Sequence, residues 1–103
     1  MEDKIEVKID RYGTKKYYKN GKLHRLNGPA IELSCGDKYW YYEGMLHRLN
    51  GPAIEGSNGW KDWYYEGRLI TSSSQEDFER LIRPHLSGSL LMWGQIYGRQ
   101  NWS

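Results

Sequence analysis

Apolar and aromatic residues recur along this chain at intervals of 23 residues, a pattern that indicates a structural repeat. The segment 23–32, Leu-His-Arg-Leu-Asn-Gly-Pro-Ala-Ile-Glu, returns unchanged as 46–55. The same offset relates further sets of residues: Gly21, Gly44 and Gly67; Tyr17, Trp40 and Trp63; Tyr18, Tyr41 and Tyr64; and Leu23, Leu46 and Leu69. The chain therefore contains two full units, 11–33 and 34–56, and a truncated third, 57–71.

Each unit predicts short strands separated by tight turns. The run 39–42 consists of β-forming aromatic residues, and Gly44 closes a hairpin after it. Asn20-Gly21 favours a type I′ turn, in which both central residues have positive φ, and Asn27-Gly28-Pro29 marks the next reversal. Because one such unit cannot bury an apolar face alone, the units must pair. The predicted fold class is mostly β, an antiparallel meander of three repeat units.

The region 72–103 departs from the repeat and predicts a cap for the sheet. Ser73 and Glu76 fit a Ser-x-x-Glu capping box. Apolar residues then follow at helical spacing: Phe78, Leu81 and Ile82. A short helix is expected over about 74–83, ending near Pro84.

The tail 84–103 is the most apolar part of the chain and has two interpretations. It forms one or two final strands that complete the sheet, or it closes a homodimer. In either case a chain of 103 residues is expected to be a single domain.

Composition changes the expected character of the core. Trp and Tyr supply 14 of the 15 aromatic residues, so burial depends on large amphipathic rings. Trp40 and Trp63 are expected to be buried structural residues, each stabilising the fold by about 3 to 5 kcal/mol.

Cysteine usage and hydropathy indicate the compartment. The single cysteine, Cys35, excludes an intramolecular disulfide, and the sequence shows no signal-peptide pattern. The longest apolar run is four residues, far below the roughly 18 to 20 needed to span a bilayer. A cytoplasmic protein without a membrane partner is expected.

The His-Arg pairs His24-Arg25 and His47-Arg48 are the most prominent candidates for chemistry. Because both stand in identical surroundings, we interpret them as structural residues that tie the Asn-Gly turn to the aromatic strand. Catalysis would need His as acid or base and Arg as an anion clamp. Two histidines on equivalent strands, about 10 Å apart, are too distant to share a metal ion unless the sheet folds over. No catalytic residue, metal site or cofactor is expected.

Positions at which the copies differ are the predicted partner-binding residues, because the shared positions are explained by the shared fold. They are joined by the basic residues of the first unit, which carries six Lys or Arg against a single Glu, and by Trp93 in the tail. The set is Lys15, Lys16, Lys19, Lys22, Tyr42, Met45, Tyr65, Arg68 and Trp93. The alternative reading of these lysines is a solvated edge that prevents sheet aggregation.

The string Trp-Tyr-Tyr-Glu-Gly-Met-Leu-His-Arg-Leu-Asn-Gly-Pro-Ala at 40–53 resembles short repeats of tailed-phage and giant-virus proteins that carry a His-Arg-x-Asp/Asn-Gly-Pro-Ala motif. The likeness covers residues 11–71. The Tyr-x-x-Gly-x-Leu core of the unit is also, more distantly, similar to MORN type 2 repeats. It implies a repeat scaffold of viral origin without known catalytic residues.

Three functions are consistent with these patterns. The first is a phage-encoded inhibitor that binds a host protein, such as a defence nuclease complex of the CRISPR type. The second is a nucleic-acid-binding module that uses the basic first unit. The third is a virion component that self-associates through its tail.

Overall fold

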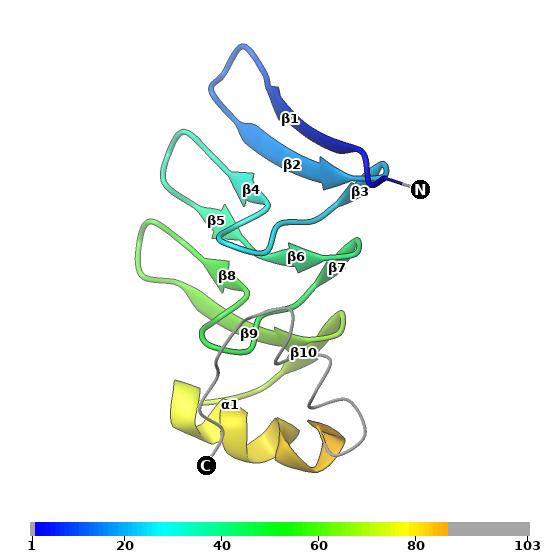
Figure 1. Ribbon diagram of the computed structural model, residues 1–103. Coiled ribbons are helices and arrows are strands. Elements are labelled where there is room, and N and C mark those ends of the chain that lie inside the picture. Colours follow the sequence, from blue (N-terminus) through cyan, green and yellow to red (C-terminus); the bar gives the residue numbers. More distant parts are fainter. Residues whose placement is uncertain (1, 87–103) are drawn as a thin grey trace.

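Strands are the main regular secondary structure of the computed structural model, which describes residues 2–86 (Figure 1). In chain order the elements are β1 (Ile5–Ile9), β2 (Lys15–Lys19), β3 (Lys22–Leu23), β4 (Ile31–Glu32), β5 (Lys38–Tyr39), β6 (Tyr41–Tyr42), β7 (Met45–Leu46), β8 (Ile54–Glu55), β9 (Lys61–Tyr65), β10 (Arg68–Ile70), α1 (Gln75–Ile82) and a 3₁₀ turn (Arg83–Leu86). The predicted fold class, a mostly antiparallel β repeat with a short helix after it, is confirmed.

Eight strands form an open antiparallel sheet in the order β1-β2-β4-β5-β8-β9-β10, with β3 paired to β2 beside this path, and β6 and β7 form a separate two-stranded sheet. The return strand is interrupted in the first two units, and in the second unit the outgoing strand is also divided, into β5 and β6. In the first unit β3 pairs with one end of β2 and β4 with the other end, so the residues between them leave the sheet. We call these excursions, 24–30 and 47–53, the motif loops. The sheet lies with β1 at one end and α1 at the other (Figure 1).

Tight turns with positive φ close the hairpins at one end of the strands, which we call the hairpin edge. Asn20 and Gly21 have φ of 51° and 82°, which confirms the predicted type I′ geometry. Glu43 and Glu66 take the place of Asn20 in the next two units, with φ of 50° and 49°. A glutamate rarely adopts this conformation, so the surrounding sheet imposes it.

Strand alternation divides the side chains between two faces. The inner face carries Tyr17, Trp40 and Trp63, and the motif loops and α1 pack on this side. Its core cluster consists of Leu49, Trp63, Tyr65, Phe78, Ile82 and Leu86, with Tyr42 and Ile70 against it. The other side, which we call the open face, carries no buried hydrophobic side chain among the described residues.

The helix begins one residue later than the capping box predicts. Ser74 is the N-cap, and its Oγ accepts a hydrogen bond of 3.1 Å from the Asp77 backbone N–H. Asp77 in turn accepts from the backbone N–H of Ser73. The cap therefore uses Ser74 and Asp77 instead of the predicted Ser73 and Glu76, and the Asp77 carboxylate bonds to the residue before the N-cap. Pro84 lies inside the 3₁₀ turn that follows.

Two further outcomes concern the ends of the chain. Strand β1 was not among the predicted elements, although it forms the edge of the sheet beside β2. The expectations for the tail after Leu86, including Trp93, lie outside the described residues. Within residues 2–86 no helix is long and apolar enough to cross a membrane.

The two tryptophans predicted to be equivalent differ in burial. Trp63 is 8% exposed inside the core cluster, whereas Trp40 is only half-buried beneath the Arg48 guanidinium. Trp63→Ala is expected to lower the free energy of unfolding by about 3 to 5 kcal/mol, and Trp40→Ala by about 1 to 2 kcal/mol. Urea titrations followed by circular dichroism measure both. Equal losses would contradict the difference in packing.

Candidate functional site

The arginine of each motif joins a motif loop to the long strand beside it. The Arg48 guanidinium carbon lies 3.7 Å from the centre of the Trp40 ring, and Nη1 donates to the Pro52 carbonyl and to Glu55, both at 3.0 Å. Arg25 repeats these contacts on Tyr17, Pro29 and Glu32. Both guanidinium groups therefore have structural partners on the inner face.

The histidine of each motif joins its unit to the next one. Nδ1 of His24 accepts a hydrogen bond of 2.9 Å from the Glu43 backbone N–H, and Nδ1 of His47 accepts one of 2.8 Å from Glu66. The imidazoles also alternate with tyrosine rings in a column: His24, Tyr42, His47, Tyr65 and His85. His24 and His47 are 7% and 1% exposed, so neither ring is placed to meet a substrate.

Burial lowers the pKa of both motif histidines, and it lowers that of His47 to about 4. The ring of His47 is therefore neutral at pH 7, which its role as an Nδ1 acceptor requires.

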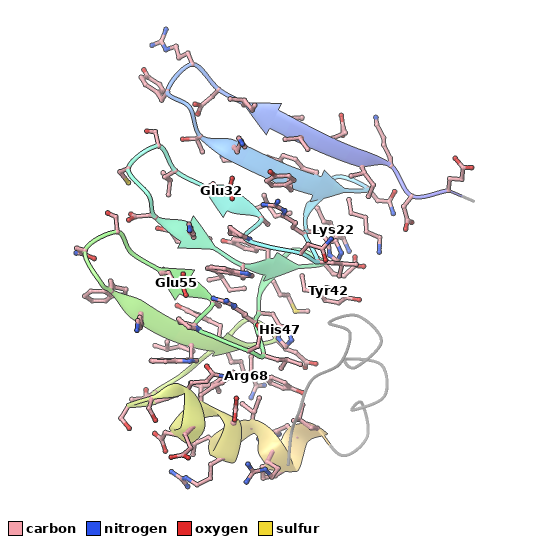
Figure 2. All side chains as sticks on the ribbon, turned by 60° about the vertical axis from the view of Figure 1, so that its left-hand side comes forward. Lys22, Glu32, Tyr42, His47, Glu55 and Arg68 are labelled. Carbon is pink, nitrogen blue, oxygen red and sulfur yellow. The ribbon has the colours of Figure 1, made fainter. Side chains whose placement is uncertain are left out.

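The residues predicted to bind a partner mostly gather at the hairpin edge of the sheet, near Lys22, Tyr42 and Arg68 in Figure 2. Strand register places them directly opposite one another in three pairs: Lys19 with Lys22, Tyr42 with Met45, and Tyr65 with Arg68. Lys22, Met45 and Arg68 are exposed. Lys15 and Lys16 lie apart from this group, at the opposite end of β2.

The expectation for Tyr65 needs correction. Tyr65 is 8% exposed and belongs to the core cluster, so it is not part of an exposed surface. The four lysines do not share one face, because Lys16 alternates with Lys15 along β2 and points to the open face. In addition, Lys19 pairs with Glu43 at 2.9 Å and with Asp3 at 3.8 Å.

The open face carries two parallel rows of aromatic and apolar side chains that the sequence analysis did not single out. The first row follows the hairpins: Tyr18, Leu23, Tyr41, Leu46, Tyr64 and Leu69. The second row follows the other half of the sheet: Ile31, Tyr39 and Ile54, with Trp60 beside them. Most are half-buried, and Trp60 and Leu69 are 61% and 54% exposed.

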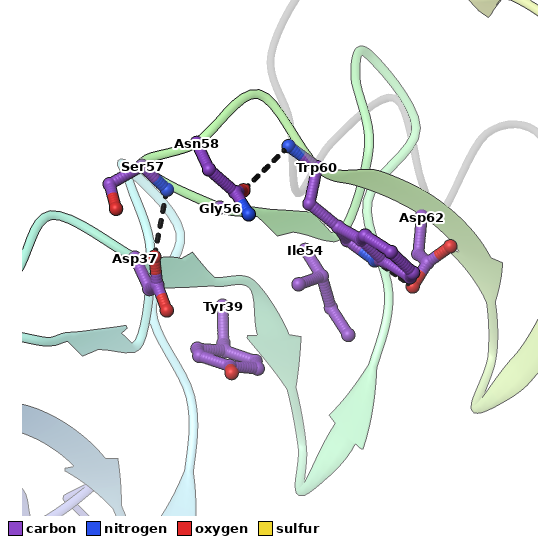
Figure 3. Close-up of a pocket in the computed structure, with 8 residues that line it drawn as sticks. All are labelled: Asp37, Tyr39, Ile54, Gly56, Ser57, Asn58, Trp60 and Asp62. Carbon is purple, nitrogen blue, oxygen red and sulfur yellow. Dashed lines mark hydrogen bonds between the residues drawn. The ribbon is translucent and has the colours of Figure 1, made fainter.

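A groove of about 360 Å³ lies at one end of the second row (Figure 3). Tyr39 and Trp60 stand on either side of Ile54, and two carboxylates, Asp37 and Asp62, border them. Asp62 accepts a hydrogen bond of 2.6 Å from the Trp60 indole N–H. Asp37 accepts one of 2.7 Å from the Ser57 backbone, which lowers the pKa of this carboxyl. Aromatic rings beside ionised carboxylates are suited to a cationic side chain.

Side chains that can ligate a metal, and a thiol, also lie in the described part of the chain. No group of three or more His, Cys, Asp or Glu side chains there is arranged to hold a metal ion. Cys35 is an exposed free thiol in the turn between β4 and β5.

Comparison with known proteins identifies no relative. No family model, no curated protein and no solved structure matches the chain. The resemblance to viral short-repeat proteins therefore stays a prediction.

The neutral state of His47 generates a pH dependence of stability. An unfolded histidine has a pKa near 6.5, so between about pH 6.5 and 4 the unfolded chain binds more protons than the folded chain. The free energy of unfolding is expected to be highest above pH 6.5 and to fall by about 3 kcal/mol as the pH drops to about 4. Urea midpoints measured at several pH values test this.

His47→Asn supplies the control, because an amide oxygen can accept the Glu66 bond but does not titrate. This variant is expected to be less stable at pH 7 and to lose most of the slope between pH 6.5 and 5. An unchanged slope in the variant would show that other groups cause the pH dependence.

Proposed function

We propose that this protein is a non-catalytic binding module that docks one partner protein on its open face. The observation that carries the proposal is the contrast between the two faces. The motif loops and α1 pack on the inner face of the repeat units and leave only β1 uncovered on that side, whereas the Tyr and Leu rows of the opposite side have no covering element among the described residues. A contiguous apolar surface of this kind is typical of an interaction site.

The residue types on the open face favour a protein partner. Tyrosine and tryptophan dominate the energetics of protein interfaces, since their rings bury much area and lose little conformational entropy. Tyr41 is already partly desolvated by its neighbours, which raises the pKa of its hydroxyl. Such a ring loses little hydration when a partner covers it.

The charges on this face favour a protein over a nucleic acid. Lys8 and Lys16 lie at one end, with the Lys8 ammonium 5.1 Å from the centre of the Tyr18 ring, but Asp37 and Asp62 border the groove at the other end. A phosphate backbone that followed the aromatic rows would meet these carboxylates. A protein surface can present both signs of charge.

The groove supplies a point of specificity within this proposal. A lysine or arginine side chain of the partner would place its cationic group between the Tyr39 and Trp60 rings and pair it with Asp37 or Asp62. The resemblance to phage repeat proteins supports the finer proposal that the partner is a bacterial host protein and that docking inhibits it.

A pull-down from bacterial lysate, with and without nuclease, followed by mass spectrometry, is expected to recover a stoichiometric protein that survives nuclease treatment. Saturating amounts of the chain should then abolish the activity of that protein. Recovery of nuclease-sensitive material alone would contradict the proposal and favour a nucleic-acid ligand.

Two double variants then locate the surface. Tyr64→Thr with Leu69→Thr alters a directly opposed pair on the open face and is expected to weaken binding about thirtyfold or more. Met45→Thr with Arg68→Thr alters the hairpin edge and should leave the affinity within about twofold. Titration calorimetry with the purified partner measures both. The reverse result would place the binding surface at the hairpin edge.

A further inference from the structure

Strand β1 leaves one edge of the sheet with apolar side chains in solvent. It pairs with β2 on one side, and no described strand pairs with its other side. Ile5, Val7 and Ile9 point to the inner face and are 65%, 50% and 63% exposed. An exposed edge strand with such side chains is a template for pairing with another chain.

The main-chain groups that face outward can be identified from the ladder with β2. The Asn20 N–H donates to the Lys4 carbonyl at 2.8 Å, and the Asp10 N–H donates to the Thr14 carbonyl at 3.1 Å. Antiparallel pairs alternate between bonded and non-bonded, so every second residue of β1 bonds to β2. The residues between them direct their N–H and C=O groups away from β2: Ile5, Val7 and Ile9.

The order of charges along β1 is complementary to itself. In an antiparallel pair of two β1 strands centred on Val7, Glu6 lies opposite Lys8 of the second copy, and Lys8 lies opposite Glu6. Lys4 and Asp10, which flank the strand, match in the same way. Ile5 lies opposite Ile9 of the second copy. This register pairs the same three residues that offer outward main-chain groups.

Neighbouring registers lack this match. Centring the pair on Glu6 sets Glu6 against Glu6 and Lys4 against Lys8. Centring it on Lys8 sets Lys8 against Lys8 and Glu6 against Asp10. Like charges directly opposite each other destabilise a sheet, so electrostatics selects the register centred on Val7.

We propose that two copies of this chain associate edge to edge through β1, with the two-fold axis passing between the two Val7 residues. Three bonded residue pairs would supply six main-chain hydrogen bonds, and six aliphatic side chains would meet on the inner face. Because the axis is perpendicular to the sheet, the two open faces lie on the same side of the dimer. The dimer thus offers one continuous surface of twice the length.

Sedimentation velocity of the full chain over about 5 to 500 µM tests the dimer, since a small edge contact implies a micromolar dissociation constant. The wild type is expected to shift from monomer to dimer across this range. Residue 6 of each copy lies opposite residue 8 of the other, and we call these two pairs the 6/8 contacts. Glu6→Lys and Lys8→Glu each place like charges at both contacts and should weaken the dimer at least about tenfold. A wild type that stays monomeric throughout would overturn the proposal.

Mixing the two variants makes the test specific. In a mixed dimer both 6/8 contacts regain opposite charges, so an equimolar mixture should dimerise although neither variant does alone. A folding defect could not produce this rescue. If the wild type dimerises and both variants dimerise equally well, the interface lies elsewhere, for example in the tail after Leu86, and the proposal is wrong.

Val7→Pro gives an independent check. The N–H that it removes faces away from β2, and proline is tolerated on a free edge. Retained β-sheet circular dichroism with loss of the dimer supports the β1 interface. Retained dimer would overturn it.

Discussion

The hydrogen bond from a hairpin turn to the buried histidine of the preceding unit is the interaction on which this fold depends. It requires a neutral imidazole, and burial provides one by lowering the histidine pKa. The return strand breaks directly after the histidine, since the backbone N–H groups of His24 and His47 still bond to their own unit, whereas those of Arg25 and Arg48 bond to the next unit. The motif loops follow from that break, and the arginines beside the histidines hold them against the sheet.

This arrangement makes each unit depend on its neighbour. Leu26 and Leu49 occupy the same position in identical decapeptides, yet they are 45% and 0% exposed. The difference arises because Leu49 packs against Trp63 and α1, whereas Leu26 has no helix over it. In an array of repeat units a residue is buried only where the next element covers it. The two ends of the array lack a following unit, so each must be covered or left exposed in its own way. Here α1 covers one end and β1 leaves the other as a free edge.

The sequence could predict what local chemistry determines. Exact repetition of the sequence defines the units. The preference of Asn-Gly for positive φ predicts the turn at Asn20-Gly21, and the helical spacing of apolar residues predicts α1 to within a residue. It could not assign faces, since the run 39–42 is aromatic at every position and carries no period-2 signal. For the same reason the burial of Tyr65 was not foreseeable. Strand β1 was predictable, because Ile5-Glu6-Val7-Lys8-Ile9 alternates strictly, but it lies outside the repeat.

The argument that function lies where repeat copies differ assumes that the fold needs every shared position. In this sheet only the inner face builds the core, so positions shared on the open face are free of that constraint. Tyr18, Tyr41 and Tyr64 recur there once per unit, two strand spacings or roughly 10 Å apart. Identical rings at a fixed interval form a regular surface, and shared positions can therefore carry recognition as well as structure.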